Sequence, residues 1–331
     1  MRAVVVEKFG PLDEASVRDI ESPAPESRQV LIETKYAGVN FPDLLMINGA
    51  YQVKPELPFS PGMEVSGVVA GVGDDVKDFS TGDRVAAHVG YGAYAERVVA
   101  QAAHCYPIPE GVSFEHAAAL GLVYQTAHFA LTERAHVSGG ERVLVLGAAG
   151  GIGTATIQLV KAYGATAFAG IRRREQEEVV RSAGADHIVD VGVKAIDENL
   201  RSQIHAITNG HGVDIVIDPV GGKLFNAGLR ALAWGGRLVV VGFASGELPT
   251  VKANHLLLKN LSVIGLHWGD YLRREPQWVR RVQNDLYSLY GKGKIRPHIM
   301  RSYALDDFRE ALKTIKGGHV QGKILLNIGN G

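Results

Sequence analysis

One stretch of the sequence constrains the fold more than any other. A run of branched apolar residues over 142–147 breaks into a cluster of glycines and then continues with helical spacing from Thr154. A buried strand, a glycine turn and a helix in this order can hold a pyrophosphate. Bare backbone approaches the phosphates closely, and the N–H groups at the start of the helix point towards them. The stretch therefore predicts a dinucleotide-binding turn.

The glycine pattern in this turn departs from the usual form. In the spacing G-x-G-x-x-G the three positions hold Ala148, Gly150 and Gly153, so alanine replaces the first glycine. The strand before the turn and the helix after it favour a bound dinucleotide, whereas the alternative is a tight turn without a ligand. The residues expected to contact the cofactor here are Ala149, Gly150, Gly151, Ile152 and Gly153.

Length and composition fit a globular protein and exclude several classes. The chain has 331 residues, which suits two domains, and its 35 basic residues balance 35 acidic ones. Without net charge, no overall field favours nucleic acid or an acidic membrane. The N-terminal segment turns polar too early for a signal peptide, and no apolar stretch is long enough to span a bilayer. The one cysteine, Cys105, permits no intrachain disulfide, which fits a reducing interior, and we expect a cytoplasmic protein.

The pattern of predicted elements changes along the chain. Residues 1 to about 122 contain short strands separated by Pro and Gly, which predicts a compact barrel or sandwich. From residue 142 strands alternate with helices, as in a parallel sheet covered on both faces. The strands expected there are 142–147, 166–170, 187–190, 213–218, 237–242 and 261–266. After about residue 270 the mixed α/β character of the tail indicates a return to the first domain.

Motifs from end to end resemble those of one superfamily. They are, in order, Gly38–Leu45, Gly49–Tyr51, Pro58–Gly67, Gly82–Val85, Gly92–Glu96, the glycine turn, Asp214–Gly222, Gly235–Val239 and Gly322–Leu325. Together they are similar to the medium-chain dehydrogenase/reductase superfamily, in its zinc-free NADPH:quinone oxidoreductase (zeta-crystallin-like) branch. The resemblance implies an α/β fold, with a GroES-like β-barrel catalytic domain over 1–122 and 270–331 and a Rossmann-type doubly wound parallel sheet domain over 123–269. It also implies a cleft between the two, and a homodimer joined through an edge strand near Leu261–Gly265.

The residues at the zinc positions of related proteins argue against a metal. Zinc-dependent relatives have a Cys and a His ligand where this chain has Asn40 and Met63. A carboxamide is a poor zinc ligand, and a neutral thioether is too soft for a catalytic zinc site. Glu64 alone cannot hold zinc, and the twelve histidines show no H-x-H or HExxH spacing. We therefore expect no metal, and an acceptor that is already electron-poor, such as a quinone or a conjugated enone.

The residues after the second strand of the nucleotide domain indicate which cofactor is used. NAD-specific folds place an Asp or Glu about twenty residues past the glycines, where it binds the ribose hydroxyls. This chain has Ile171 there, followed by Arg172, Arg173 and Arg174. A 2′-phosphate carries roughly two negative charges, which guanidinium groups match bidentately. We therefore predict NADPH, with a solvated basic loop as the alternative; the sequence does not distinguish among the three arginines.

The resemblance alone implies the residues at the nicotinamide end. Thr126 matches a threonine near the nicotinamide ribose, and Lys323 matches a lysine near the cleft. Two loops match segments that lie over the cofactor; their residues are Phe243, Ala244, Leu266, His267 and Trp268. The aromatic residues among them could equally be packing residues, since apolar residues after strands usually pack.

Three residues are candidates for the chemistry, namely Tyr51, Asn40 and Asp43. Tyr51 matches the tyrosine that related enoyl reductases are thought to use as proton donor, and a phenol can hydrogen-bond the oxygen on which negative charge develops. Asn40 could orient the substrate or the nicotinamide with its amide. As alternatives, Asp43 caps a helix that begins near Leu44, and Tyr51 packs over the barrel.

Three functions remain open from the sequence. The first is an NADPH-dependent quinone reductase, and the second is an NADPH-dependent reductase of the C=C bond in an enone, enal or enoyl thioester, which would use the same residues. The third is a nucleotide-binding structural or RNA-binding protein of the zeta-crystallin-like kind. The neutral net charge and the lack of an aromatic–basic RNA motif disfavour it, so the expected partner is a small electron-poor acceptor.

Overall fold

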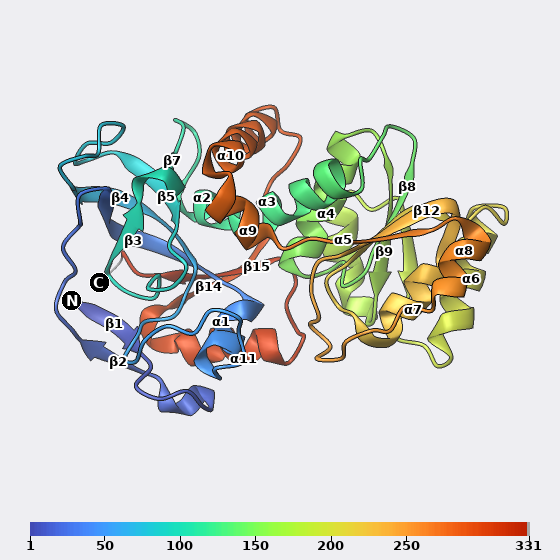
Figure 1. Ribbon diagram of the computed structural model, residues 1–331, viewed down its shortest axis with the longest axis horizontal. Helices are drawn as coiled ribbons and strands as arrows, with labels where there is room; N and C mark the ends of the chain where they lie inside the picture. Colours follow the sequence, from blue (N-terminus) through green and yellow to red (C-terminus); the bar gives the residue numbers. More distant parts are fainter. Residues whose placement is uncertain (330–331) are drawn as a thin grey trace. The chain divides into compact units, whose positions relative to one another are not determined.

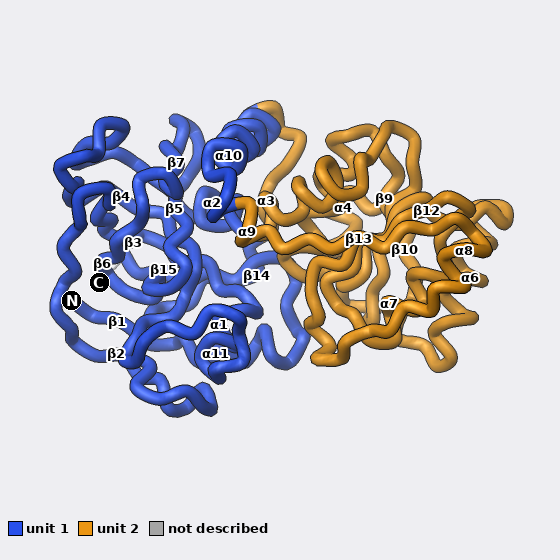
Figure 2. The backbone as a smooth tube through the Cα atoms, viewed as in Figure 1, with its two compact units in different colours: residues 1–122, 272–291, 299–331 blue, residues 123–271, 292–298 orange. Residues whose placement is uncertain are grey.

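The computed structural model describes residues 1–329 and divides into two compact units (Figure 2). Unit 1 comprises Met1–Leu122, Leu272–Gly291 and the chain from Ile299 onward, and unit 2 comprises Val123–Tyr271 and Lys292–His298. The segment 292–298, which the sequence analysis assigned to the first domain with the rest of 270–331, therefore belongs to unit 2. Residues 330–331 of that range lie outside the described residues.

Unit 1 is built on a mixed sheet. Within residues 1–329 it has seven strands, in the order β14-β15-β3-β4-β5-β7 with β6 also paired to β3, and β1 and β2 form a separate pair. The strands are β1 (Arg2–Val5), β2 (Ser16–Asp19), β3 (Gln29–Val39), β4 (Glu64–Val72), β5 (Arg84–His88), β6 (Arg97–Gln101), β7 (Cys105–Pro107), β14 (Ile299–Ala304) and β15 (Lys323–Asn327). The last strand of the chain lies antiparallel beside β3, so the C-terminal segment completes the N-terminal sheet (Figure 1).

Alternation along the strands builds the core of unit 1. In β3 the side chains of Val30, Ile32 and Thr34 are buried, whereas Glu33 between them is exposed. Strands that alternate in this way bury one face and leave the other towards water. The helices of this unit are α1 (Phe41–Ile47), α2 (Phe114–Ala119), α10 (Pro276–Gly291) and α11 (Phe308–Lys316), with short 3-10 turns at η1 (Leu12–Glu14), η2 (Ala102–His104) and η5 (Leu305–Asp307).

Unit 2 is a parallel sheet with helices between its strands. In the part of the chain that the structure describes, the sheet has six strands in the order β10-β9-β8-β11-β12-β13. The strands are β8 (Arg142–Val145), β9 (Thr166–Ile171), β10 (His187–Asp190), β11 (Val213–Asp218), β12 (Leu232–Val240) and β13 (Ser262–Gly265). Numbered along the chain this order is 3-2-1-4-5-6, the doubly wound order of a Rossmann domain. The predicted fold class is confirmed.

The helices of unit 2 follow from this order. The sheet grows in one direction from β8 and in the other from β11, so right-handed crossovers place α4 and α7 on opposite faces (Figure 1). The helical elements are α4 (Gly151–Ala162), η4 (Arg174–Gln176), α5 (Glu177–Ser182), α6 (Ile196–Ile207), α7 (Gly222–Ala231) and α8 (Ala253–Lys259). Three further elements are α3 (Leu122–Phe129), the π-helical turn η3 (Ala130–Arg134) and α9 (Trp268–Arg274). None of the helices within residues 1–329 combines the length and hydropathy that a bilayer-spanning segment needs.

One strand begins earlier than the sequence pattern indicated. The expected strand 237–242 is the second part of β12, which already pairs with β11 at Leu232 and then shifts register before Arg237. Gly235 has a φ of 73° inside this irregular part, and glycine alone adopts that conformation readily. Trp234 is 75% exposed there. Alternation of apolar residues could not reveal a strand that begins with an irregularity.

Candidate functional site

Three polar side chains meet inside unit 1, at the ends of three neighbouring strands of its sheet. Asn40 follows the end of β3, Glu64 begins β4 and Lys323 begins β15. Nζ of Lys323 donates to Oε1 of Glu64 at 2.7 Å and to Oδ1 of Asn40 at 2.6 Å, and Nδ2 of Asn40 donates to the same Glu64 oxygen at 2.9 Å. All three side chains are buried. The lysine predicted to lie near a cofactor is thus the cation of a buried ion pair.

The second oxygen of Glu64 binds the start of a helix. Oε2 accepts a hydrogen bond of 2.6 Å from the backbone N–H of Leu122, the first residue of α3. Burial acts to raise the pKa of Glu64, but the charges of Lys323 and His88 and the hydrogen bonds outweigh it, so the pKa lies below its ordinary value. Glu64 is therefore an ionised carboxylate with a donor on each oxygen.

The surroundings of Glu64 do not fit a metal ion. The groups that point at its carboxylate are N–H donors, and one of them is the ammonium of Lys323. A divalent cation in this place would face the lysine charge and would compete with it for the same oxygen. Among residues 1–329 no three His, Cys, Asp or Glu side chains lie close enough to hold a metal ion.

Asp43 is buried beside this network, in the first turn of α1. Its Oδ2 accepts the backbone N–H of Asn40 at 2.7 Å and the hydroxyl of Tyr94 at 2.8 Å. Its Oδ1 is buried with no hydrogen-bond partner among the described residues. Burial raises the pKa of Asp43 to about 7, against the hydrogen bonds from Tyr94 and Asn40. The side chain thus holds the beginning of α1, but the helix begins at Phe41 and not near Leu44, so Asp43 lies inside the first turn and Asn40 is the N-cap.

Tyr51 follows α1 and packs against the apolar core of unit 1 while staying partly exposed. Burial, and then the charge of Asp43, raise the pKa of its hydroxyl above the ordinary value. Within the described part of the chain no hydrogen bond to this hydroxyl is formed. A protonated phenol without a protein partner is available to a ligand.

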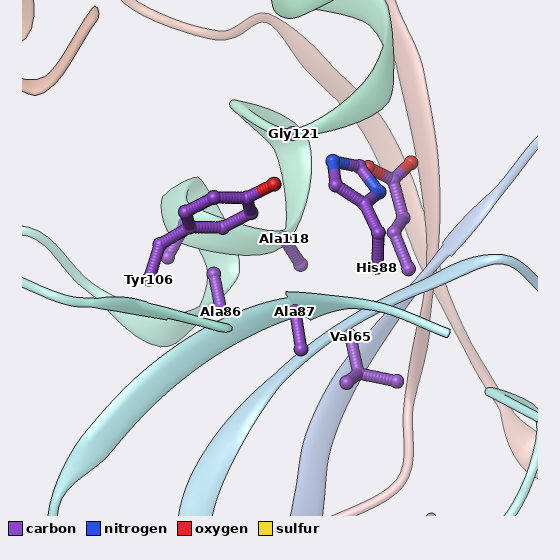
Figure 3. Close-up of a pocket in the computed structure, with 9 residues that line it drawn as sticks. Val65, Ala86, Ala87, His88, Tyr106, Ala118 and Gly121 are labelled. Atoms are coloured by element: carbon purple, nitrogen blue, oxygen red, sulfur yellow. The ribbon is translucent and has the colours of Figure 1, made fainter. Parts of the chain in front are cut away.

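A small cavity adjoins Glu64 (Figure 3). Its lining residues are Glu64, Val65, Ala86, Ala87, His88, Tyr106, Ala117, Ala118 and Gly121. The rings of His88 and Tyr106 contact each other edge to face, with centroids 5.8 Å apart. The cavity volume of about 10 Å³ has room for about one water molecule, far below the roughly 300 Å³ at which small-molecule sites begin. The cavity is therefore not the site of an organic substrate.

The glycine turn of unit 2 has the geometry that a phosphate needs. The first hydrogen bond within α4 runs from the N–H of Thr154 to the carbonyl of Gly150 at 2.9 Å. The N–H groups of Gly151, Ile152 and Gly153 precede that bond, so the helix itself provides no partner for them. A Cβ on Gly153 would overlap the carbonyl oxygens of Gly147 and Ala148. Glycine there lets the helix approach the end of the strand closely.

The alanine at the first motif position has a structural explanation. Gly147, one residue earlier, has a φ of 60°, so it provides the left-handed conformation that the tight turn requires. Ala148 and Ala149 are buried. The sequence pattern included Gly147 in the expected strand 142–147, whereas β8 ends at Val145 and Gly147 belongs to the turn.

The arginines after β9 lie on a turn fixed by a buried glutamine. Oε1 of Gln176 accepts the backbone N–H groups of Arg172 at 3.0 Å and Arg173 at 3.2 Å. The side chains of Arg172 and Arg174 are exposed, and no carboxylate in residues 1–329 lies within ion-pair distance of either. Ile171 ends β9 and is buried. Sequence reasoning missed Gln176, because the residue three positions before it is Arg173 and not the Ser or Thr of a capping box.

The other predicted nicotinamide residues divide by burial. Three of them are buried as packing residues are, namely Thr126 on α3, Leu266 and Trp268. His267 is exposed, and Phe243 is 41% exposed. The N–H of Ala244 donates to the carbonyl of Pro219 at 3.1 Å.

Another residue that sequence reasoning missed is Asp218, at the end of β11. Its buried Oδ1 accepts the N–H groups of Val220 at 2.8 Å and Gly221 at 2.9 Å. Burial raises the pKa of this carboxyl, against those two hydrogen bonds. Asp218 therefore shapes the turn that precedes α7.

Two domain families match separate parts of the chain. The alcohol dehydrogenase GroES-like domain family matches residues 26–110, and the zinc-binding dehydrogenase family matches residues 151–284. The quinone oxidoreductase-like protein 2 homolog of Nematostella vectensis is 38% identical over 301 residues, which cover 90% of this chain and 81% of that protein.

Two solved structures are similar over nearly the whole chain. The quinone oxidoreductase of Escherichia coli complexed with NADPH has a TM-score of 0.91 and 27% identity, and covers 99% of this chain and 100% of its own. A mycobacterial protein complexed with NADPH has a TM-score of 0.92 and 30% identity, with the same coverage of 99% and 100%.

Proposed function

Because the chain belongs to the zinc-free quinone oxidoreductase branch of the medium-chain dehydrogenase/reductase superfamily, we propose that it transfers a hydride from NADPH to a quinone without a metal ion. The relative in Nematostella is named a quinone oxidoreductase-like protein and the similar structure from Escherichia coli a quinone oxidoreductase, and the structures similar to the chain include complexes with NADPH. The partner proposed is a small electron-poor acceptor, either a quinone or a conjugated carbonyl compound.

The observation that carries the choice of NADPH is the turn after β9. Ile171 is an apolar residue at the place where an acidic side chain would bind ribose hydroxyls, so nothing there repels a phosphate. Two exposed guanidinium groups follow, and the side chain of Gln176 fixes the backbone that carries them. We propose that Arg172, Arg173 and Arg174 bind the 2′-phosphate of NADPH, through charge-assisted hydrogen bonds.

The start of α4 fits the pyrophosphate of the same cofactor. Gly151, Ile152 and Gly153 present their N–H groups before the first helical hydrogen bond. A Cβ on Gly150 would meet the carbonyl oxygen of Gly147 at an ordinary contact distance of 3.5 Å. The remaining cofactor contacts that we propose are those expected from the sequence, namely Ala149, Thr126, Phe243, Ala244, Leu266, His267, Trp268 and Lys323.

The bound cofactor supplies the hydride, and the residues of unit 1 supply hydrogen bonds. A quinone that accepts a hydride develops negative charge on oxygen. The Tyr51 hydroxyl is protonated and forms no hydrogen bond with the described residues, so we propose that it donates to that oxygen. Asn40 and Asp43 act as supports in this proposal. Lys323 and Glu64 engage the amide, and the carboxyl accepts the Asn40 N–H and the Tyr94 hydroxyl.

The state of Tyr51 also favours a second candidate reaction. Reduction of a C=C bond in an enone or an enoyl thioester needs a proton as well as a hydride, whereas the oxygen of a reduced quinone can take its proton from water. The protonated Tyr51 hydroxyl could supply the proton that C=C reduction needs. We therefore propose enone, enal or enoyl-thioester reduction as the alternative activity of the same site.

A panel of acceptors tests both reactions. The purified chain is mixed with NADPH or NADH and with quinones and enones of similar size, and nicotinamide absorbance is followed. Quinone reduction that depends on NADPH supports the proposed function, and faster enone reduction supports the alternative. Binding of NADPH without turnover of any acceptor would instead favour a nucleotide-binding protein without this activity.

The quaternary state we propose is a homodimer joined through β13. This strand ends the sheet order of the described chain and is paired with β12 on one side, so its other edge can pair with a second copy. Helix α8, shortly before it, buries none of its residues, and Leu257 and Leu258 are 79% and 74% exposed. Adjacent exposed leucines beside an open strand edge are typical of an interface.

The setting proposed follows from the cofactor. A reductase that consumes NADPH requires a compartment that regenerates it, and we propose the cytoplasm for this reason. We propose no nucleic-acid or membrane partner, because the 35 basic and 35 acidic residues leave the chain without net charge.

A further inference from the structure

We infer that Gln176 is a positioning residue for cofactor selectivity, because its side chain fixes the backbone turn that carries Arg172, Arg173 and Arg174. The inference rests on the proposed function, in which these arginines bind the 2′-phosphate of NADPH. Gln176 itself contacts no part of the cofactor and acts through the backbone of the turn. All of these residues belong to unit 2.

Hydrogen bonds from Gln176 close the turn on itself. Its Oε1 accepts the backbone N–H groups of Arg172 at 3.0 Å and Arg173 at 3.2 Å, and its own backbone N–H donates to the carbonyl of Arg173 at 3.1 Å. Gln176 is buried, whereas Arg172 and Arg174 are exposed. The group that holds the turn therefore lies inside the unit, and two of the guanidinium groups that it positions lie at the surface, where a ligand can reach them.

The same hydrogen bonds decide which groups of the turn can bind a phosphate. Many phosphate sites use free backbone N–H groups, but Gln176 already engages those of Arg172 and Arg173. The guanidinium side chains must therefore bind the phosphate here. Arginine side chains lose conformational entropy when they are ordered, and a fixed backbone lowers the cost of bringing several of them to one phosphate.

The amide of Gln176 accepts these hydrogen bonds without carrying a charge. One carbonyl oxygen has two lone pairs and can accept both N–H groups. The residues around it in the sequence, Glu175, Glu177 and Glu178, are acidic, and Glu177 forms an ion pair of 2.8 Å with Arg181. A carboxylate at position 176 could accept the same N–H groups but would add a negative charge close to the phosphate. Glutamine holds the turn without that repulsion.

A glycine supports the turn from its other side. Beyond the paired strands β9 and β10, the N–H of Val191 donates to the carbonyl of Ile171 at 2.8 Å. A Cβ on the next residue, Gly192, would overlap the carbonyl oxygen of Arg172. Gly192 does not have a positive φ, so close approach explains the glycine, and its N–H donates to Oδ1 of Asp190 at 2.7 Å. Arg172 is thus held at its N–H by Gln176 and confined at its carbonyl by Gly192.

Two substitutions disturb the turn from opposite sides without changing any charge. Gln176→Leu keeps a side chain of similar size but removes the acceptor, and Gly192→Ala displaces the carbonyl of Arg172. The matched control is Gln158→Leu, at another buried glutamine of unit 2. Gln158 accepts the N–H of Arg296 at 2.7 Å and donates to its carbonyl at 2.7 Å, so this control also removes backbone hydrogen bonds.

The experiment measures the dissociation constants of the purified full-length variants for NADPH and NADH. Gln176→Leu and Gly192→Ala should weaken NADPH about five- to tenfold more than NADH, because arginines on a looser turn cost more to order around the phosphate. Gln158→Leu should leave the ratio of the two constants unchanged. General destabilisation weakens both cofactors alike and does not change this ratio.

An unchanged ratio in Gln176→Leu, or an equal change in Gln158→Leu, would overturn the inference. If Gln176→Leu fails to fold, Gly192→Ala decides alone. The joint replacement of Arg172, Arg173 and Arg174 by alanine separates the inference from the proposed function. Equal loss of NADPH and NADH in that variant would reject the phosphate site, and this inference with it. Selective loss of NADPH there, with an unchanged ratio in Gln176→Leu, would reject this inference alone.

Discussion

The ammonium of Lys323 lies 2.7 Å from Oε1 of Glu64, and both side chains are almost completely buried, at 4% and 2% exposure. The two residues are 259 positions apart in the sequence. The pair joins the first residue of the last strand, β15, to the first residue of β4. Since Asn40 bonds both partners, the pair also fixes the residue that directly precedes α1.

Removal of one partner from this pair should destabilise the fold strongly. Lys323→Met leaves the Glu64 carboxylate buried without its counter-ion, and we expect a loss of about 3–5 kcal/mol in the free energy of unfolding. Urea denaturation at pH 7 measures this loss in the free energy of unfolding. The control Lys35→Met breaks the exposed pair with Glu33 and should cost less than about 1 kcal/mol. Similar losses in the two variants would contradict the importance of burial.

Asp43 should make stability depend on pH in a defined direction. Its pKa is raised to about 7 by burial, so the folded chain holds a proton that the unfolded chain releases at lower pH. Its contribution to the free energy of unfolding therefore falls as the pH rises from about 4 to about 7 and is constant above that. The charged and titratable groups around it are Tyr94, Lys323, Glu64 and Tyr51.

The variant Asp43→Asn isolates this contribution. Its amide oxygen can still accept from Asn40 and Tyr94, but the side chain no longer titrates. We expect the free energy of unfolding of the variant, minus that of the unaltered chain, to increase steadily between pH 4 and pH 7. Urea denaturation at intervals of one pH unit measures this difference. A difference between the two proteins that does not change with pH would show that Asp43 does not titrate in this range.

Local patterns and long-range contacts differ in how far the sequence reveals them. The apolar runs and glycine positions predicted β8, β9 and β11 because a buried parallel strand and its turn are local features. The partners of Glu64 are not local. Leu122 and Lys323 reach it only after the chain has folded, and their apolar or basic character alone indicates neither contact. Asn40 was chosen from the sequence as a possible substrate contact, yet its amide is engaged by protein groups.

Tyr51→Phe should separate the two candidate reactions. The variant keeps the ring but loses the hydroxyl, so enone reduction should fall about 100-fold, the scale of general acid catalysis. Quinone reduction should fall less, because the reduced oxygen can be protonated by water, and the KM for NADPH should not change. Tyr91→Phe, at an exposed tyrosine of the same unit, serves as control. Unaltered enone turnover would remove Tyr51 as the proton donor.

The arginine turn should decide between the phosphorylated and the unphosphorylated cofactor. Joint replacement of Arg172, Arg173 and Arg174 by alanine should weaken NADPH binding about 10- to 100-fold, the loss expected for charge-assisted hydrogen bonds. NADH binding should change little, since it lacks the 2′-phosphate. Arg201→Ala, at an exposed arginine of α6, controls for loss of positive charge. Equal loss of NADPH and NADH would place the phosphate site elsewhere.

The exposed leucines of α8 should control the assembly state. Joint replacement of Leu257 and Leu258 by glutamate puts two charges on a surface that a second copy would have to bury, and desolvation of unpaired charges opposes such burial. Light scattering coupled to gel filtration should therefore show a dimer for the unaltered chain and a monomer for the variant. Ile20→Glu, at an exposed apolar residue of unit 1, should leave the dimer intact. A monomeric unaltered chain, or a variant that remains dimeric, would move the interface away from α8 and β13.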